Sequence, residues 1–514
     1  WPPTYSSGKP ITGTVQTDDG SALAAQMPSW TDAQFIIDNP TQGTHALNGV
    51  NYPDQGLVPK LVKALGTGWS VTSGPGWIHV KSPANTPITE LRIDDGYANQ
   101  IANGLIHQVT TVTKLPVEAP DKYKVEITGD TTKTGDRYFV QYDARDKVWK
   151  EAVGWDIIKG LDTATMPHAL IRKADGSFVF TRLDGSVDLG NGQKIQSWAE
   201  RTCGDDDTNP QPSFVGGTFN DVFMFRNRLG LLAGENIILS RTSKYFNFYP
   251  ASVANESDDD PIDVAVSHNR ISILKYAVPF SEQLLLWSDQ AQFVLAAEGI
   301  LSAKTIELNL TTQFDVSDFA RPFGLGQNVY FASPRANFTS IMRYYSVQDV
   351  TAIKNAENTC AHVPSYIPNG VFSIWGTSSE NFMTVLSENA HSKIFVYKFL
   401  YQNEQLVQQS WSHWDFGNDI KIYSCNSINS TLFVIYETET DLLFGTIDFT
   451  QNILDNQYEP YRTYIDHKVA FQPVAADFDI SINKTKITPH KIYGATFPIS
   501  EFVVINQEGF IQRF

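Results

Sequence analysis

The sequence predicts a mostly β protein, in which a propeller-like ring of antiparallel hairpins follows a smaller α+β domain at the N-terminus. One pattern repeats from about residue 212 onward: a run of branched or aromatic residues, a polar turn, and a second such run. Upstream, apolar and polar residues alternate with a period of two, as in half-buried strands. The length of 514 residues and the 42% hydrophobic content exceed what one core usually supports, so several packed units are expected.

The predicted α+β domain covers residues 1–115. Leu57, Leu61, Val62 and Leu65 have the spacing of one helical face, and Gly66 is a typical residue for ending a helix. Two short strands are expected after it, at Trp69–Thr72 and Trp77–Lys81, with the turn at Gly74-Pro75-Gly76. The pattern therefore predicts a helix packed on a hairpin.

A β-rich connecting domain is predicted for residues 116–211. Tyr123, Val125 and Ile127 alternate with polar residues, and Tyr138–Tyr142 is expected to pair with Val148–Ala152.

The propeller-like domain is predicted for residues 212–466. Its expected hairpins are Val222–Phe225 with Leu229–Leu232, Leu284–Trp287 with Phe293–Ala296, Val329–Ala332 with Ile341–Tyr345, Met383–Leu386 with Ile394–Phe399, and Leu432–Tyr436 with Leu442–Ile447. Their turns are placed at Asn227, Ser288-Asp289-Gln290, Pro334-Arg335, Glu388-Asn389 and near Thr438. The spacing is close to the roughly 40 to 50 residues of a propeller blade with added loops. A sandwich of irregular hairpins is the open alternative. Residues 467–514 are expected to be a β-rich C-terminal segment, truncated at its end.

Charge and composition exclude several classes of protein. A net charge of −17 without a visible basic patch argues against ordinary nucleic-acid binding, which needs clustered Lys and Arg, but is compatible with a conduit that repels DNA. No apolar run is long enough for a membrane helix, and the N-terminus lacks the layout of a signal peptide, so no membrane insertion is expected. The chain begins without Met inside an apparent loop, which suggests a processed or shortened product.

Cofactor and metal signatures are lacking. Cys203, Cys360 and Cys425 are widely spaced with no C-x-x-C pair, so buried free thiols are expected rather than disulfides or zinc ligands. The sequence contains no G-x-S-x-G elbow, Walker A loop or H-E-x-x-H motif. We therefore expect neither an enzyme nor a bound cofactor, although the carboxylate pair of a glycosidase leaves no sequence signature.

Two segments are candidate sites. Asp258, Asp259, Asp260 and Asp263 form the densest acidic cluster, which is interpreted as a solvated turn, with a cation site or mutually raised pKa values as the alternative. The aromatic segment Trp411–Phe416, with Trp411 and Trp414, is interpreted as core packing, with an interface or a sugar-stacking surface as the alternatives.

Several longer stretches carry a family resemblance. They are Asn220–Gly230, Gly234–Thr242, Lys244–Ser252, Asp258–Val266, Met166–Leu170, Pro212–Gly216, Asn309–Asp315, Tyr397–Phe416 and Ile492–Ala495. In these stretches the chain resembles the tail tubular protein B, or nozzle, family of T7-like short-tailed bacteriophages. The resemblance runs from about Gly66 to the end, and the chain departs from the pattern before Trp30.

The resemblance implies a structural role. It implies a homohexameric nozzle in the virion tail that docks on tail tubular protein A, carries tail fibre protein nearby and is assembled in the host bacterial cytoplasm. DNA would pass through its lumen without specific binding, and lumenal loops would close the channel until genome ejection. The family supplies no catalytic residue. The alternatives are a tail-associated polysaccharide hydrolase, motivated by the carboxylates and the eleven tryptophans, and a cell-surface-binding module, motivated by Trp411–Phe416.

Overall fold

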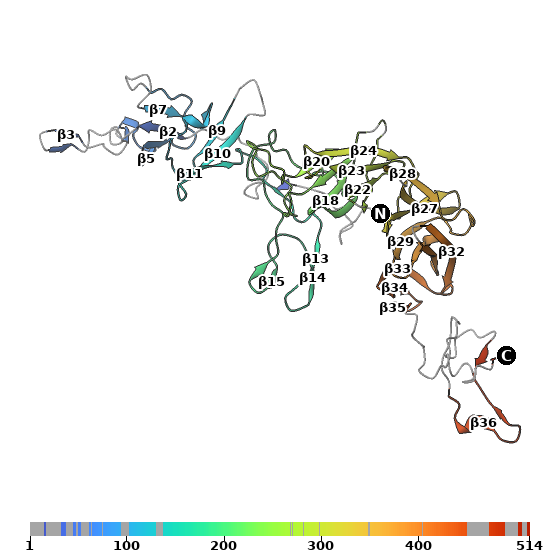
Figure 1. The fold of residues 1–514 in the computed structure, drawn as a ribbon. Coiled ribbons are helices and arrows are strands. Elements are labelled where there is room, and N and C mark those ends of the chain that lie inside the picture. The colour runs from blue at the N-terminus through green and yellow to red at the C-terminus, as the bar shows by residue number, and fades with distance from the viewer. Residues whose placement is uncertain are drawn as a thin grey trace.

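The computed structural model describes residues 61–449 with gaps at 63, 75, 94–101, 130–136, 268, 270, 281, 298, 348–349 and 403–404. It also describes residues 15–16, 32–37, 45–47, 50–52, 472–488, 502–505 and 511–513. Over these residues the chain is mostly β, as the sequence predicts. Figure 1 shows an elongated molecule in which small sheets follow one another along the chain.

The N-terminal part contains the predicted hairpin. Strand β5 (Ser70–Gly74) pairs antiparallel with β6 (Trp77–Lys81), and this hairpin joins β2 (Asp32–Ile37) and β7 (Ala102–Leu105) in the order β5-β6-β2-β7. Residues 61, 62, 64 and 65 are helical, and Gly66, with a φ of 79°, donates its N–H to the Val62 carbonyl at 3.2 Å. The hairpin is therefore confirmed, and the described part of the predicted helix is helical, whereas Leu57 lies outside the described residues. The packing of the helix on the hairpin in one α+β domain stays a prediction.

The next sheet has the order β11-β10-β9-β8. Its strands are β8 (Gln108–Val109), β9 (Lys124–Ile127), β10 (Tyr138–Asp143) and β11 (Val148–Ala152). The predicted pairing of Tyr138–Tyr142 with Val148–Ala152 is confirmed. Val125, Ile127 and Val140 are buried in its core, as the alternating pattern requires.

Two hairpins project from the body of the molecule (Figure 1). One joins β13 (Ala169–Arg172) and β14 (Phe178–Thr181), and the other joins β15 (Asp188–Gly190) and β16 (Gln193–Lys194). Ile171 on the first hairpin belongs to one apolar cluster with Leu189 on the second hairpin and Val187 just before it. The Ala174 N–H donates to the Leu189 carbonyl at 2.9 Å, which further joins the two hairpins.

A row of antiparallel sheets follows, and within each sheet the strands pair in sequence order. In the described residues the four-stranded sheets are β17 (Asp221–Phe225) to β20 (Ile262–Ala265), β21 (Tyr276–Phe280) to β24 (Ile306–Thr312), β25 (Phe323–Leu325) to β28 (Val350–Asn358), and β29 (Val371–Thr377) to β32 (Gln405–Asp415). Their inner members are β18 (Arg228–Ala233), β19 (Asn236–Leu239), β22 (Gln283–Trp287), β23 (Gln292–Ala297), β26 (Asn328–Arg335), β27 (Phe338–Val347), β30 (Phe382–Ser387) and β31 (Lys393–Gln402). The last sheet in this row is three-stranded: β33 (Lys421–Ile428), β34 (Thr431–Glu437) and β35 (Leu442–Asp448).

The sheets of this row pack face to face through apolar clusters. In β22, Leu284 and Leu286 face the sheet before, whereas Leu285 and Trp287 face the sheet after. A strand covered on both faces needs a continuous apolar run, and β22 has one. The first strand of each sheet lies next to the first strand of the next sheet, from β17 to β33.

The predicted hairpins are confirmed, with one turn corrected. Pro334 and Arg335 belong to β26, where they pair with Thr339 and Phe338, so the turn lies at Ala336 and Asn337. Pro334 is tolerated because it lies near the strand end, and Ala336 takes the positive φ, 51°, that a two-residue turn requires. The propeller-like ring itself stays a prediction.

The remaining described elements are short. They are β1 (Val15–Gln16), β3 (His45–Leu47), β4 (Val50–Tyr52), β12 (Gly160–Leu161), β36 (Phe478–Asp479), β37 (Lys484–Thr485), β38 (Val503–Ile505), β39 (Ile511–Arg513) and the 3-10 turns η2 (Val112–Lys114), η4 (Glu388–Ala390) and η5 (Ala475–Asp477). None of the helical segments in the described ranges is long and apolar enough to cross a membrane. The predicted boundary at residue 466 lies outside the described residues.

Candidate functional site

The acidic segment closes over a buried arginine. Arg228, at the start of β18, is only 1% exposed, yet it carries a full charge in the core. Its guanidinium donates to carbonyl oxygens of Ser240 at 2.8 Å, Asp260 at 2.6 Å, Asp258 at 2.7 Å and Leu301 at 3.1 Å. The backbone around Asp258–Asp260 thus satisfies a buried cation, a role that the sequence pattern does not indicate.

Two carboxylates of this segment meet at Arg241, since Asp260 Oδ1 lies 3.8 Å from Arg241 Nε. Asp259 pairs with the buried Arg241 at 2.5 Å, and Asp260 accepts the N–H groups of Ser257 at 2.9 Å and Ala251 at 3.2 Å. Hydrogen bonding to Ser257, followed by the charge of Arg241, lowers the pKa of Asp259. The pKa of Asp259 is therefore lowered, whereas the alternative interpretation of the sequence expected crowded carboxylates to raise one another's pKa.

Asp263 lies apart from the other acidic residues, on β20. It accepts the Ser213 N–H at 2.7 Å and the Ser213 hydroxyl at 2.6 Å, and the Asn236 amide at 3.0 Å. Across the described residues, no group of three or more His, Cys, Asp or Glu side chains is arranged to hold a metal ion. The structure therefore brings the Asp259 and Asp260 carboxylates together at Arg241. Asp263 lies elsewhere and links β20 to the Pro212–Gly216 segment through hydrogen bonds with Ser213.

The two tryptophans of the aromatic segment also separate. Trp411 lies 5.0 Å from the Tyr397 ring and donates its indole N–H to the Thr359 carbonyl at 3.1 Å. Trp414 stacks on Phe449 at 5.7 Å, next to the cluster between the last two sheets of the row. Both side chains are half-buried in different inter-sheet cores, so they do not form one flat platform for a ligand. A role for them in an interface stays a prediction.

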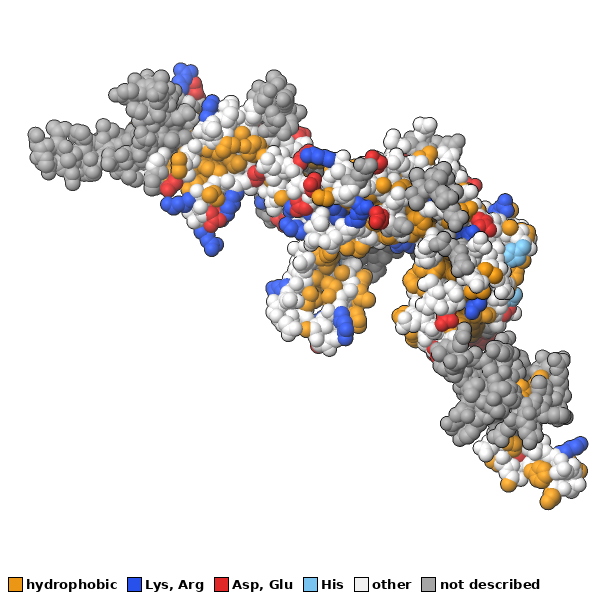
Figure 2. Space-filling model, in the orientation of Figure 1, with side chains coloured by type: hydrophobic (Ala, Val, Ile, Leu, Met, Phe, Trp, Pro, Cys, Tyr) orange, Lys and Arg blue, Asp and Glu red, His pale blue; other side chains and the backbone are white. Residues whose placement is uncertain are grey.

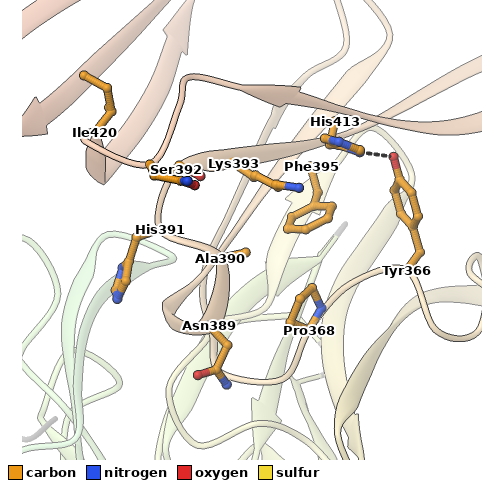
Figure 3. A pocket seen from close by; sticks show the side chains of 11 residues that line it. Tyr366, Pro368, Asn389, Ala390, His391, Ser392, Lys393, Phe395, His413 and Ile420 are labelled. Atoms are coloured by element: carbon orange, nitrogen blue, oxygen red, sulfur yellow. Dashed lines mark hydrogen bonds between the residues drawn. The ribbon is translucent and has the colours of Figure 1, made fainter.

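A groove of about 450 Å³ opens beside the aromatic segment (Figure 3). Phe395 and Tyr366 supply aromatic surface, and the Tyr366 hydroxyl lies 2.6 Å from Nδ1 of His413. The other lining residues are Pro368, Asn389, Ala390, His391, Ser392, Lys393, Asn418 and Ile420. None of the described lining residues is Asp or Glu, so the groove lacks the carboxylate pair of a glycosidase.

The cysteines are buried, as expected. Cys203, Cys360 and Cys425 are free thiols in the structure. Burial raises the pKa of Cys203 and of Cys425 to about 11, so both thiols are neutral and unreactive at neutral pH.

Two apolar faces that the sequence pattern does not single out are exposed in the structure. One is on the β13–β14 hairpin, where Leu170, Phe178 and Phe180 are each about two-thirds exposed; the other is on β34–β35, around Leu442 and Phe444. Figure 2 shows the apolar surface of the projecting hairpins. The alternation of Leu170 and Arg172 with Ala169 and Ile171 indicates a strand with two different faces. It does not reveal which of the two faces packs against the rest of the protein.

Comparison with known proteins gives a consistent family. A family model described as bacteriophage nozzle protein matches residues 11–514. "Tail tubular protein gp12" of Escherichia phage T7 is 53% identical over 486 residues, which are 94% of this chain and 59% of that protein, so the chain spans less than two thirds of this relative.

Solved structures show only distant similarity. Kluyveromyces lactis Hsv2 with its complete loop 6CD aligns with a TM-score of 0.31 and 12% identity, over 52% of this chain and 71% of that chain. The N-terminal domain of Nup159 aligns with a TM-score of 0.27 and 10% identity, over 44% of this chain and 56% of that chain.

Proposed function

Because this chain belongs to the bacteriophage nozzle protein family, we propose that it is a structural subunit of a phage tail tube that conducts DNA and gates the channel for genome ejection. The observation that carries the proposal is the family match over residues 11–514 together with 53% identity to a tail tubular protein. The subunit acts in the virion tail.

The row of sheets between β17 and β35 is proposed to be a set of propeller blades. Adjacent first strands and cores between successive sheets support this arrangement, because blades of a propeller pack face to face around their innermost strands. Each inter-sheet core is buried, so neighbouring sheets cannot slide without exposing apolar surface. Such a unit suits a tube wall that must keep its shape.

The negative charge is proposed to keep DNA from adhering. A net charge of −17 per subunit, multiplied in a homohexamer, makes a wall that repels a polyanion within a Debye length of about 8 Å at physiological salt. Lumenal loops would close this channel before infection. The proposed wall needs no sequence-specific contact with the duplex.

The proposed partners are those that the family resemblance implies, and the proposed domain scheme is the one that the sequence pattern predicts. We propose docking on tail tubular protein A at one end, attachment of tail fibre protein nearby, and assembly in the host bacterial cytoplasm. The proposed domains are residues 1–115, 116–211, 212–466 and 467–514. The comparisons do not support the alternatives of a polysaccharide hydrolase or a cell-surface-binding module, and no enzymatic activity is proposed.

Electron microscopy of the full-length protein, alone and with the adaptor, tests this function. We expect rings with an axial channel, and DNA of the same electrophoretic mobility with and without the rings. A protein that stays monomeric in both preparations, or rings that retain duplex DNA at physiological salt, would contradict the proposal.

A further inference from the structure

The outer face of the β13–β14 hairpin is apolar and basic. Leu170 lies opposite Phe180, and Arg172 lies opposite Phe178, so these four side chains share one face of the two-stranded sheet. Leu170 is 66% exposed, Phe178 65% and Phe180 70%. Residues 168–182 contain three basic residues and one acidic residue, in a chain that is strongly acidic overall.

The outer face of the last sheet in the row is apolar and acidic. Ile435 lies opposite Phe444, and Glu437 lies opposite Leu442, so these side chains share the face turned away from the preceding sheet. Leu442 and Phe444 are both 67% exposed. Residues 431–448 contain Glu437, Glu439, Asp441 and Asp448 and no Lys or Arg. On the neighbouring strand β33, the single basic residue Lys421 lies opposite Glu437, so the three strands together remain acidic.

The two faces match in chemistry and lie on separate parts of the molecule. Figure 1 places the projecting hairpins and the β33–β35 sheet at different positions along the chain, so one copy does not bring them together. Exposed apolar surface of this kind marks an interface. Two different, complementary patches on one chain are what a head-to-tail ring requires, because each copy presents one patch to the neighbour on either side.

We infer that the β13–β14 hairpin of one copy packs on the outer face of the β33–β35 sheet of the neighbouring copy. The inference rests on the proposed ring and names the surfaces that close it. Leu170, Phe178 and Phe180 cover Ile435, Leu442 and Phe444, which removes both apolar faces from water. The hairpin face carries Arg172. The sheet face carries Glu437 and Asp448, together with Lys421, which lies opposite Glu437. Glu437 also accepts the Tyr423 hydroxyl at 2.6 Å, and pairing of Arg172 with this carboxylate sets the register of the contact.

Cysteine cross-linking of the full-length protein tests this contact directly. The variants are Phe180→Cys and Phe444→Cys, alone and combined, and the buried native thiols do not compete under native conditions. In oxidised rings, a mixture of the two single variants should give cross-linked dimers, and the double variant should give a ladder that ends at the number of copies in the ring. The control pairs Phe180→Cys with Val117→Cys, a position that is 90% exposed on another part of the chain, and should give no ladder.

The possible outcomes distinguish a failure of the inferred inter-subunit contact from a failure of ring formation itself. Rings that form normally but give no ladder in the double variant overturn the inference and leave the proposed function standing. Rings in which Phe180→Cys cross-links to itself also overturn it, because that result means a two-fold contact between identical faces. If no rings form from the unmodified protein, both the contact and the proposed function fail.

A charge exchange gives a second test. Arg172→Glu and Glu437→Arg, made singly, should each weaken assembly by about tenfold, because each places like charges at the contact. The double exchange should restore assembly, whereas Lys398→Glu, a charge reversal at an exposed position on β31, should leave assembly unchanged. A double exchange that assembles no better than either single variant contradicts the pairing, provided that thermal unfolding shows all variants folded.

Discussion

Asp221 and Arg321 form an ion pair, with 3.0 Å between Asp221 Oδ1 and Arg321 Nη1, that links the first sheet of the row to the segment just before the third sheet. Asp221 begins β17, and Arg321 lies two residues before β25. Ala277 on β21, the strand between them, donates its N–H to Asp221 at 2.9 Å and accepts from Arg321 at 2.9 Å. One carboxylate and one guanidinium therefore link β17, β21 and the segment before β25 along the edge of the row that the first strands form.

Removing the guanidinium should loosen this edge. Arg321→Ala leaves the buried Asp221 carboxylate without its charge partner, and we expect a loss of about 2 kcal/mol in the free energy of unfolding. Urea denaturation followed by tryptophan fluorescence measures the loss. The matched control is Arg335→Ala, an arginine exposed near a hairpin turn, which should change stability by less than about 0.5 kcal/mol. Equal effects of the two substitutions would contradict the structural role of the pair.

The Asp221–Arg321 pair should make the stability cost of Arg321→Ala depend on pH. Burial raises the pKa of Asp221, and the charge of Arg321 and two backbone N–H groups oppose this rise. A carboxyl group with a raised pKa contributes stability that is fully present below its unfolded pKa of about 3.9 and is lost as the pH rises through the folded pKa. Because Arg321→Ala removes an opposing charge, it raises the Asp221 pKa further, so its penalty should shrink as the pH falls from neutrality toward about 4.

The control for this dependence removes the titrating group. In the Asp221→Asn background, the effect of Arg321→Ala on the urea midpoint should be the same at every pH tested. If the penalty of Arg321→Ala in the native background is also independent of pH, the carboxylate is not the group responsible.

The hydrogen bonds of the Arg228 guanidinium should hold the backbone of the acidic segment in place. Arg228→Ala removes the guanidinium that pairs with carbonyl oxygens from Ser240, Asp258, Asp260 and Leu301, and it also leaves a cavity. We expect a loss of about 3 kcal/mol or more, and faster proteolysis between residues 242 and 261. Arg226→Ala, which removes a more exposed arginine in the same turn, is the control and should leave the proteolysis rate nearly unchanged. Cleavage that proceeds equally in both variants would argue against this anchoring role.

The first sheet of the row has no room for a side chain at Gly230. It lies opposite Phe223, and a Cβ atom at Gly230 would come within 2.1 Å of the Phe223 ring. Gly230→Ala should therefore cost about 1 to 3 kcal/mol, because the buried ring must move within a close-packed core. Gly324→Ala is the control, since its added Cβ would meet its nearest neighbour at an ordinary 3.8 Å. Thermal unfolding should separate the two variants, and equal melting temperatures would contradict the account.

Strands that are joined by recognisable turn residues were predicted correctly from local sequence patterns. Arg226 and Asn227 take positive φ values of 42° and 62°, and the turn between β17 and β18 lies where the sequence places it. The same reasoning failed at Pro334, because a proline near a strand end was interpreted as the turn. Third and fourth strands such as β19 and β28 were missed, although only two residues separate each from the strand before it. β19 is only four residues long, and β28 contains several polar residues, so neither is a long apolar run.

The candidate sites were harder to predict than the strands. The sequence shows Asp258–Asp260 as a charge cluster, but their carbonyl groups, which carry no sequence signal, hold Arg228. Trp411 and Trp414 look like one cluster in sequence, whereas the strand directs them into different cores. Which apolar faces are left uncovered, as at Phe180 and Phe444, depends on how sheets pack across the whole chain.

Cryo-electron microscopy of the assembled full-length protein tests the proposed conduit, because one map shows both the subunit arrangement and the channel lining. We expect a closed ring of identical copies around a channel with an acidic or neutral lining. A compact monomer, or a ring whose channel is lined by Lys and Arg, would contradict it.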